Sequence, residues 1–121
     1  MKKSEKIAAL LKVAGVSPAN LGWKYLTDAI TMSIKDRSVL DGITKVLYPA
    51  IGEKYGCTRT SVERSIRHAV NNAFNNIPDD VKYEIFGNTA NHGVVSNSEF
   101  IGTLAELIID EPNNPIWKRT K

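Results

Sequence analysis

The sequence contains few of the residues on which disulfide frameworks, zinc sites and membrane spans depend. Cys57 is the only cysteine among the 121 residues, which excludes an internal disulfide and a zinc site built from several cysteines, and is typical of a reducing cytosol. No apolar run approaches the roughly 20 residues that a membrane-spanning helix needs, and the N-terminal residues lack the apolar core of a signal peptide. These absences predict a cytoplasmic protein without a membrane-embedded part.

Motifs of catalysis and of nucleotide binding are also absent. The sequence has no glycine-rich phosphate loop and no dinucleotide fingerprint. Ser33, Ser38 and Ser98 have no adjacent histidine and acid in a nucleophile motif, and His92 has no partner at the spacing of metal ligands. We therefore expect no enzyme, no cofactor, no metal site and no small-molecule substrate.

The net positive charge of the chain is confined to one segment. The formal net charge is +3, and residues 54–72, with four Lys or Arg and one acid, carry that whole excess. The rest of the chain is therefore close to neutral. This uneven distribution indicates a polyanionic partner that contacts residues 54–72.

The apolar pattern predicts an all-α domain over residues 4–111 and a C-terminal tail over residues 112–121. Apolar residues recur at steps of three and four, the spacing of a buried helix stripe, in about six segments. Ser4 is expected to cap the first helix and Gly15 to end it, and residues 93–95 are the one candidate extended piece. The expected stripes are Ile7, Leu10, Leu11 and Ala14; Trp23, Leu26, Ile30 and Ile34; Leu40, Ile43, Val46, Leu47 and Ile51; Val62, Ile66, Ala69, Val70 and Ala73; Val81, Ile85 and Phe86; and Phe100, Ile101, Leu104, Leu107 and Ile108.

Proline, glycine and capping residues mark the other expected helix boundaries. Pro49 lies inside the third stripe and predicts a kink or a break there, and Gly56 is expected to end that helix. Pro78 is expected as the first residue of the fifth helix. Ser96 and Glu99 have the spacing of a capping box and predict the start of the sixth helix.

Residues 54–72 have the pattern of the turn and recognition helix of a helix-turn-helix unit. The apolar stripe lies on one side of the predicted helix, and polar and basic residues lie on the other. Arg64 and Arg67 are about one turn apart, and each guanidinium can address O6 and N7 of a guanine. Glu63 can accept a hydrogen bond from a cytosine amino group. These three residues are the candidate base contacts in a major groove.

Other residues near the start of the same helix are candidates for contacts with DNA phosphates. Short hydroxyl side chains and backbone amides at a helix start point toward an anion. Such contacts set the register of a protein on DNA without reading the base sequence. The candidates are Lys54, Thr58, Arg59, Thr60, Ser61 and His68.

The same residues also fit a solvated helix face. Glu63 has the spacing of an ion pair with Arg59 and with Arg67, each worth only ~0.2–0.5 kcal/mol. Thr60 and Glu63 have the spacing of a capping box, and Thr58 is a candidate N-cap. From spacing alone, base contact and a merely solvated face both stay open.

A resemblance to a known family rests on three sequence blocks, ITKVLYP, VER-x-IRHA and NSEF. Over about Ile7 to Ile109 the chain resembles the C-terminal effector domain of the stage-zero sporulation master response regulator of endospore-forming bacteria. The resemblance implies a six-helix domain that binds a short promoter box containing guanine and cytosine. It also implies base contacts at Glu63, Arg64 and Arg67, and phosphate contacts at Ser61 and His68.

The chain also departs from the pattern of that family. Family members carry an N-terminal phosphoacceptor receiver domain, which this chain lacks, so we expect either an excised effector domain or a stand-alone relative. Arg59 replaces a small residue, and Gly52 stands where a helix former is usual. The loop over 88–96 is shorter than in the family, and the tail with Trp117 differs. Arg59 could add a phosphate contact.

Two functional hypotheses follow, from different classes of protein. The first is a sequence-specific transcription regulator that binds double-stranded promoter DNA in the nucleoid, with RNA polymerase as a further partner. It would be a monomer in free solution and bind adjacent boxes as two copies in tandem. The second is a protein-interaction module that binds RNA polymerase or a regulator and no longer reads DNA. A nonspecific nucleoid protein is disfavoured by the modest net charge.

Overall fold

All regular structure in the described part of the protein is helical. The computed structural model describes residues 2–87 and 93–110, and these contain six α-helices, a 3-10 turn and a π-helical turn but no strand. The all-α prediction is therefore confirmed. The elements are α1 (Lys3–Val13), α2 (Gly22–Lys35), η1 (Arg37–Leu40), η2 (Ile43–Leu47), α3 (Tyr48–Tyr55), α4 (Arg59–Asn76), α5 (Asp79–Phe86) and α6 (Asn97–Ile109).

Some of the sequence predictions concern residues outside the described ranges. His92 and most of the loop before α6, together with Trp117 and the whole predicted tail, lie outside the described residues. The candidate extended piece over residues 93–95 is described and forms no strand.

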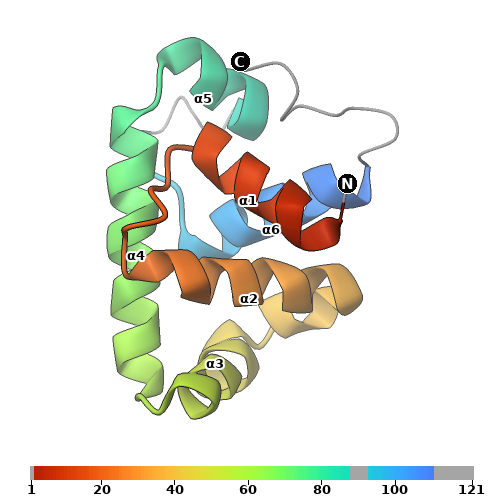
Figure 1. The fold of residues 1–121 in the computed structure, drawn as a ribbon, viewed down its shortest axis with the longest axis vertical. Helices are drawn as coiled ribbons and strands as arrows, with labels where there is room; N and C mark the ends of the chain where they lie inside the picture. The colour runs from red at the N-terminus through yellow and green to blue at the C-terminus, as the bar shows by residue number, and fades with distance from the viewer. Residues whose placement is uncertain (1, 88–92, 111–121) are drawn as a thin grey trace.

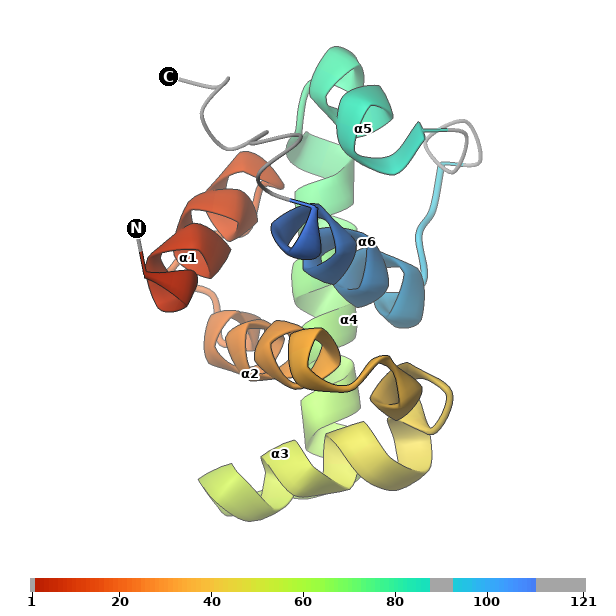
Figure 2. The same ribbon diagram turned by 90° about the vertical axis from the view of Figure 1, so that its right-hand side faces the viewer.

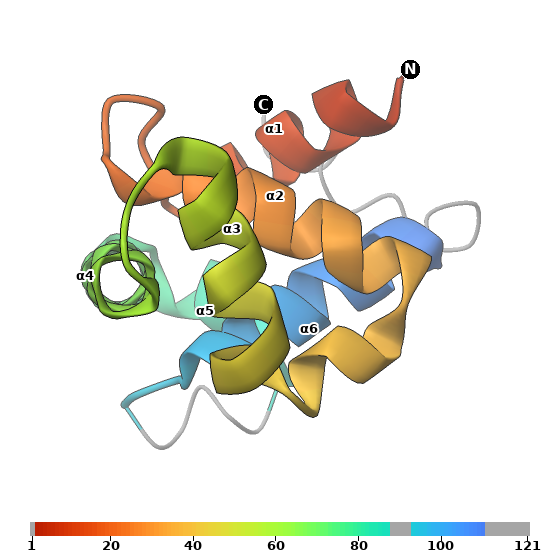
Figure 3. The same ribbon diagram turned by 90° about the horizontal axis from the view of Figure 1, so that it is seen from below.

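The longest helix, α4, forms the spine of the molecule. Figure 1 shows α4 running along one edge, with α3 at its N-terminal end and α5 at its C-terminal end. α1, α2 and α6 lie on one side of α4, and α2 packs against both α4 and α6 (Figure 2). Seen from below, α4 stands at the margin of the molecule (Figure 3). One long side of α4 is therefore left without a covering helix.

The opposite side of α4 is the centre of the hydrophobic core. Its predicted stripe is buried, and Phe74 extends that stripe by one position. Phe86 of α5 lies with its ring centroid 5.4 Å from Phe74 and 5.4 Å from Phe100 of α6. Burial of a phenylalanine side chain stabilises a fold by roughly 1.5–3 kcal/mol, and aromatic pairing adds about 0.5–1.5 kcal/mol. This aromatic row fixes α5 and α6 against the C-terminal half of α4.

Close backbone contact fixes α2 against the middle of α4. A Cβ atom at Gly22 would lie 2.6 Å from the carbonyl oxygen of Ser65 and 2.7 Å from the Cβ of Ala69. No other residue type fits at this crossing without moving one helix, since real Cβ atoms do not approach other atoms so closely. The N-terminal end of α2 therefore holds α4 from the side opposite its uncovered face.

The region predicted as one third helix consists of η1, η2 and α3. The expected break is a change of helix type at Tyr48, whose N–H bonds to the carbonyl of Ile43, and Pro49 then lies in the first turn of α3, where no donor is needed. Val46 was expected in the buried stripe, but it is 49% exposed, so that prediction was wrong. A π-helical turn bonds residues five apart and shifts the register, and Val39 of η1 is buried instead.

Three predicted boundaries are displaced by one or two residues. α1 begins before Ser4, because the Glu5 carboxylate accepts a hydrogen bond from the Lys2 N–H at 2.8 Å and caps the helix there. The sequence Asn75-Asn76-Ile77-Pro78 predicts a break, but α4 continues to Asn76. Pro78 is the N-cap of α5 and not its first residue. The capping box predicted at the start of α6 is present.

Candidate functional site

A three-residue turn connects α3 to α4 and sets the direction of α4. Gly56 ends α3 in the left-handed conformation, with φ of 68°, which glycine adopts without strain. The backbone N–H of Cys57 bonds to the carbonyl of Gly52 at 2.8 Å, so the turn folds back over α3. A Cβ at Gly52 would lie 2.5 Å from the carbonyl oxygen of Cys57. Glycine at this position therefore makes room for the turn.

Thr58 is the N-cap of α4. Its hydroxyl oxygen accepts a hydrogen bond from the Ser61 N–H at 3.1 Å, and its hydroxyl also lies 3.1 Å from the Ser61 Oγ. The capping role considered for Thr58 is confirmed, and the alternative capping box of Thr60 with Glu63 is wrong because the N-cap lies two residues earlier, at Thr58. Thr58 thus orients the first turn of α4.

The uncovered face of α4 brings together most of the residues predicted to bind DNA. Arg64 is exposed and has no hydrogen-bond or ion-pair partner among the described residues. Its position on the helix lies near the middle of the polar face, opposite the buried stripe. The other exposed members are Arg59, Thr60, Ser61, Arg67 and His68, and Asn71 lies beside them one turn further on.

Glu63 and Arg67 form an ion pair along the edge of this face. The Arg67 Nη1 lies 3.6 Å from the Glu63 Oε1, with side-chain exposures of 51% and 32%. A pair this exposed contributes at most about 0.5 kcal/mol. The pair is therefore easily exchanged for contacts with another molecule. No ion pair joins Arg59 to Glu63 within the described part of the chain.

Lys54, in contrast, is bound to an aspartate of α2. The Lys54 Nζ lies 3.0 Å from both carboxylate oxygens of Asp28, a side chain that is only 19% exposed. The Lys54 Nζ also lies 5.3 Å from the centre of the Tyr55 ring. The hydrogen bond and the charge of Asp28 raise the pKa of Lys54, and a hydrogen bond to Asp28 raises the pKa of Tyr55. Lys54 thus already has a carboxylate partner, which its sequence position did not indicate.

Asn97 and Tyr48, which were not predicted as site residues from the sequence, lie beside the edge of α4 that carries Glu63 and Arg67. The Asn97 Nδ2 at the start of α6 donates to the Tyr48 hydroxyl at 2.9 Å and reaches the backbone carbonyl of Glu63 at 3.5 Å. Beside them lies a depression of about 400 Å³. Its lining consists of Thr44, Tyr48, Glu63, Arg67, Asn71, Val95, Ser96, Asn97 and Ser98. Asn97 and Tyr48 belong to the NSEF and ITKVLYP blocks, but no spacing rule connects positions so far apart.

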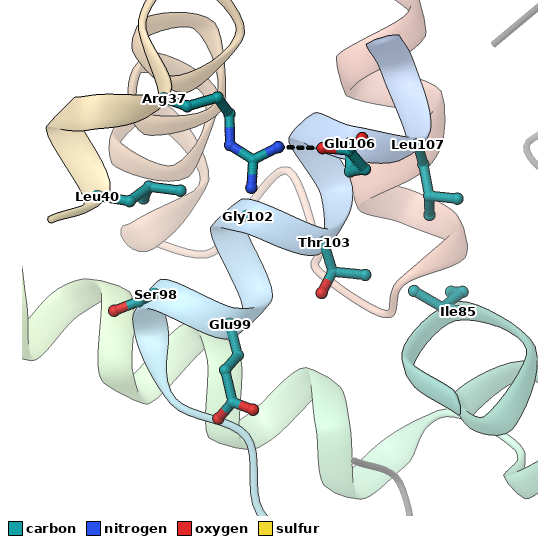
Figure 4. A pocket seen from close by; sticks show the side chains of 9 residues that line it. All are labelled: Arg37, Leu40, Ile85, Ser98, Glu99, Gly102, Thr103, Glu106 and Leu107. Carbon is teal, nitrogen blue, oxygen red and sulfur yellow. Dashed lines mark hydrogen bonds and ion pairs between the residues drawn. The ribbon is translucent and has the colours of Figure 1, made fainter. Parts of the chain in front are cut away.

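A further hollow in the described structure shares only Ser98 with the lining of this depression. It measures about 620 Å³ and lies between η1, α5 and α6 (Figure 4). Apolar side chains of Leu40, Ile85 and Leu107 line it, and an ion pair of Arg37 with Glu106 crosses one side. The hollow contains none of the residues predicted to bind DNA. No group of His, Cys, Asp or Glu in the described residues could hold a metal ion.

A family model of known proteins matches most of the chain. Residues 7–108 match the family model described as "Sporulation initiation factor Spo0A C terminal". The matched region runs from within α1 almost to the end of α6 and includes every residue predicted to contact DNA. None of the described helices combines the length and the apolar character that crossing a bilayer requires.

Proposed function

Because the chain belongs to the Spo0A C-terminal family of DNA-binding transcription regulator domains, which are not enzymes, we propose that it reads a short promoter box with α4 in the major groove. α3 and α4 then act as the helix-turn-helix unit. One observation carries the proposal: Arg64 is exposed on the polar face of α4, and the ion pair of Arg67 with the partly exposed Glu63 lies beside it.

The three residues proposed to contact bases differ in the contacts that they make before DNA binds. Arg64 has no partner to leave among the described residues, so its guanidinium can address a guanine directly. Arg67 must exchange its contact with Glu63 for a second guanine, which costs little because the pair is exposed. Glu63, once released, accepts from a cytosine amino group and repels phosphates, which adds discrimination against wrong registers.

Phosphate contacts come from the residues around this trio. Arg59, Thr60, Ser61 and His68 are exposed at the start and along the side of α4. Thr58 acts through the backbone amides that its cap orients, and Lys54 contributes less than a free lysine because Asp28 already balances its charge.

Binding should occur in the cytoplasm, on the nucleoid, with further partners. RNA polymerase is the expected protein partner of a promoter-bound regulator. Two copies in tandem on adjacent boxes would raise specificity, because one helix reads few base pairs. We expect a monomer in the absence of DNA.

Selection of bound sites from a random duplex pool, followed by titration at two salt concentrations, tests this function. We expect one enriched box, bound roughly 10³-fold or more tightly than a scrambled duplex, with a preference that persists at moderate salt. Binding to scrambled and selected duplexes with equal affinity at both salt concentrations would contradict base reading.

The second candidate function is a protein-interaction module without DNA binding. The hollow between η1, α5 and α6 favours it, because its apolar lining is open at the surface and lies away from the basic face. The same titration separates the two candidates. A chain that binds no DNA at low salt but is retained by RNA polymerase supports the module and excludes the first function.

A further inference from the structure

The polar bridge formed by Asn97 connects three elements at one point of α4. Asn97 opens α6, Tyr48 opens α3, and the carbonyl of Glu63 belongs to the second turn of α4. Tyr48 is only 4% exposed, and its hydroxyl accepts the hydrogen bond from Asn97. The bridge meets α4 at the backbone of the residue that is predicted to read a cytosine.

The bridge constrains a motion that the hydrophobic core leaves open. Apolar packing is non-directional and tolerates a small rotation of a helix about its axis, whereas a hydrogen bond requires both a distance and an angle. The stripe of α4 packs against α2 and α6, and Asn97 holds the backbone on the flank between the stripe and the DNA-facing side chains. A small rotation of α4 about its own axis would displace the side-chain ends of Glu63 and Arg67 further than it displaces the helix backbone.

Asn97 and Tyr48 also lie beside the Glu63 side chain. The depression beside Asn97 is also lined by Tyr48, Glu63 and Arg67, so the partly exposed ion pair of Glu63 with Arg67 lies along it. Arg64 projects from α4 outside the depression, and it is not among the lining residues. The bridge therefore supports one edge of the reading face more than its middle.

We propose that Asn97, together with Tyr48, is a positioning residue for DNA reading, which holds α4 so that Glu63 and Arg67 meet their base pairs. This inference rests on the function proposed above. Asn97 does not need to touch DNA in this role. It acts through the backbone carbonyl of Glu63 and through the Tyr48 hydroxyl.

The test is a base-by-base binding profile of the full chain and its variants on the selected box. Asn97→Ala is expected to lower the ratio of specific to scrambled affinity by about tenfold, because the contacts of one bidentate pair are loosened. The loss should be largest at the base pairs read by Glu63 and Arg67, which also line the depression beside Asn97, and smaller at the one read by Arg64. Affinity for the scrambled duplex, which depends on phosphate contacts, should stay the same.

Two further variants separate positioning from loss of fold. Tyr48→Phe keeps the ring and removes the hydroxyl, so a smaller loss with the same base profile is expected even if Asn97→Ala folds poorly. Ser98→Ala changes a neighbouring residue of the same depression that makes no bridge, and it should leave the profile unchanged. The melting temperature and circular dichroism of each variant report on the fold independently.

The possible failures can be told apart. If the wild-type chain prefers a box but Tyr48→Phe and Asn97→Ala leave the profile intact, or weaken all sequences alike, the positioning role is overturned and the proposed function stands. If the wild-type chain itself shows no preference for any box, the proposed function is contradicted, and so is the positioning role that depends on it.

Discussion

Lys54 and Arg64 lie on either side of the turn between α3 and α4, but their surroundings differ. The Lys54 amine donates a hydrogen bond to one carboxylate oxygen of Asp28 and lies 3.0 Å from the other, whereas Arg64 has no partner among the described residues. Both belong to the basic segment that dominates the net charge of the chain. The difference teaches that a cluster of charges in a sequence does not distinguish a charge held in the scaffold from one that is available to a partner.

The end of α3 with Lys54 and the exposed face of α4 with Arg64 have different roles in the proposed function. The pair of Lys54 with Asp28 ties the end of α3 to α2 and so supports the turn. The face with Arg64 and Arg67 has only one weak internal ion pair and can form new contacts at low cost. A rigid support behind an adaptable contact surface is what a reading helix needs, because misplaced donors lose their bidentate geometry.

The largest effect is expected from removing a free arginine. Arg64→Ala should weaken binding to the selected box by about 1–3 kcal/mol and relax the preference at one base pair, with a much smaller loss on scrambled DNA. Competition binding against single-base variants of the box measures both quantities. The control is Arg37→Ala, because Arg37 pairs with Glu106 beside the distant hollow. Equal losses for the two variants would mean that Arg64 acts only through its charge.

The turn between the two regions can be disturbed without changing a charge. Gly52→Ala places a Cβ 2.5 Å from the Cys57 carbonyl oxygen, a contact with rigid backbone. The clash costs about 1–3 kcal/mol and exceeds the gain in helix propensity of up to about 1 kcal/mol, so the free energy of unfolding should fall by about 1–2 kcal/mol. Urea unfolding measures it. Glu53→Ala, an exposed neighbour, should stay within about 0.5 kcal/mol of the wild type, and a Gly52→Ala variant as stable as that control would contradict the close contact.

The helices themselves were largely predictable from the sequence. α4 was found because five apolar positions repeat at helical spacing over a long segment, and its N-cap and the capping box of α6 are local signals. The third helix was not predictable in detail, since a π-helical turn shifts the register without leaving a sequence mark, and Val46 was wrongly assigned to the core.

The candidate site was predictable only in part, for a different reason. The exposed side of α4 follows directly from the position of its buried stripe, so Arg64 and Arg67 could be assigned to it. The partners of Lys54 and of Asn97 are 26 and 49 residues away in the chain, and only the packing of α2, α3 and α6 brings them together. Periodicity carries no information about such contacts.

The salt dependence of DNA binding distinguishes the held charge from the free ones. Arg59→Ala should lower the slope of log K against log salt concentration by about 0.9 and weaken binding to all sequences alike, as loss of one phosphate contact does. Lys54→Ala should lower the slope by clearly less, because its charge is already balanced by Asp28. Titrations on the selected and the scrambled duplex over a range of salt concentrations provide both slopes. Equal slopes for the two variants would show that Lys54 leaves Asp28 when DNA binds.

The smallest expected effect concerns the proton of Lys54. Its pKa is raised above the ordinary value of 10.5 by the hydrogen bond and the charge of Asp28, so Asp28→Asn should bring the pKa back toward that value. A raised pKa means that the pair stabilises the fold below about pH 10.5 and that this contribution is lost as the pH rises through the folded-state value. A pH titration followed by NMR of labelled lysine side chains measures the change, with Glu53→Ala, which removes another carboxylate of α3, as the control. A Lys54 pKa unchanged by Asp28→Asn would mean that the lysine is not held in solution, and the contrast with Arg64 would then disappear.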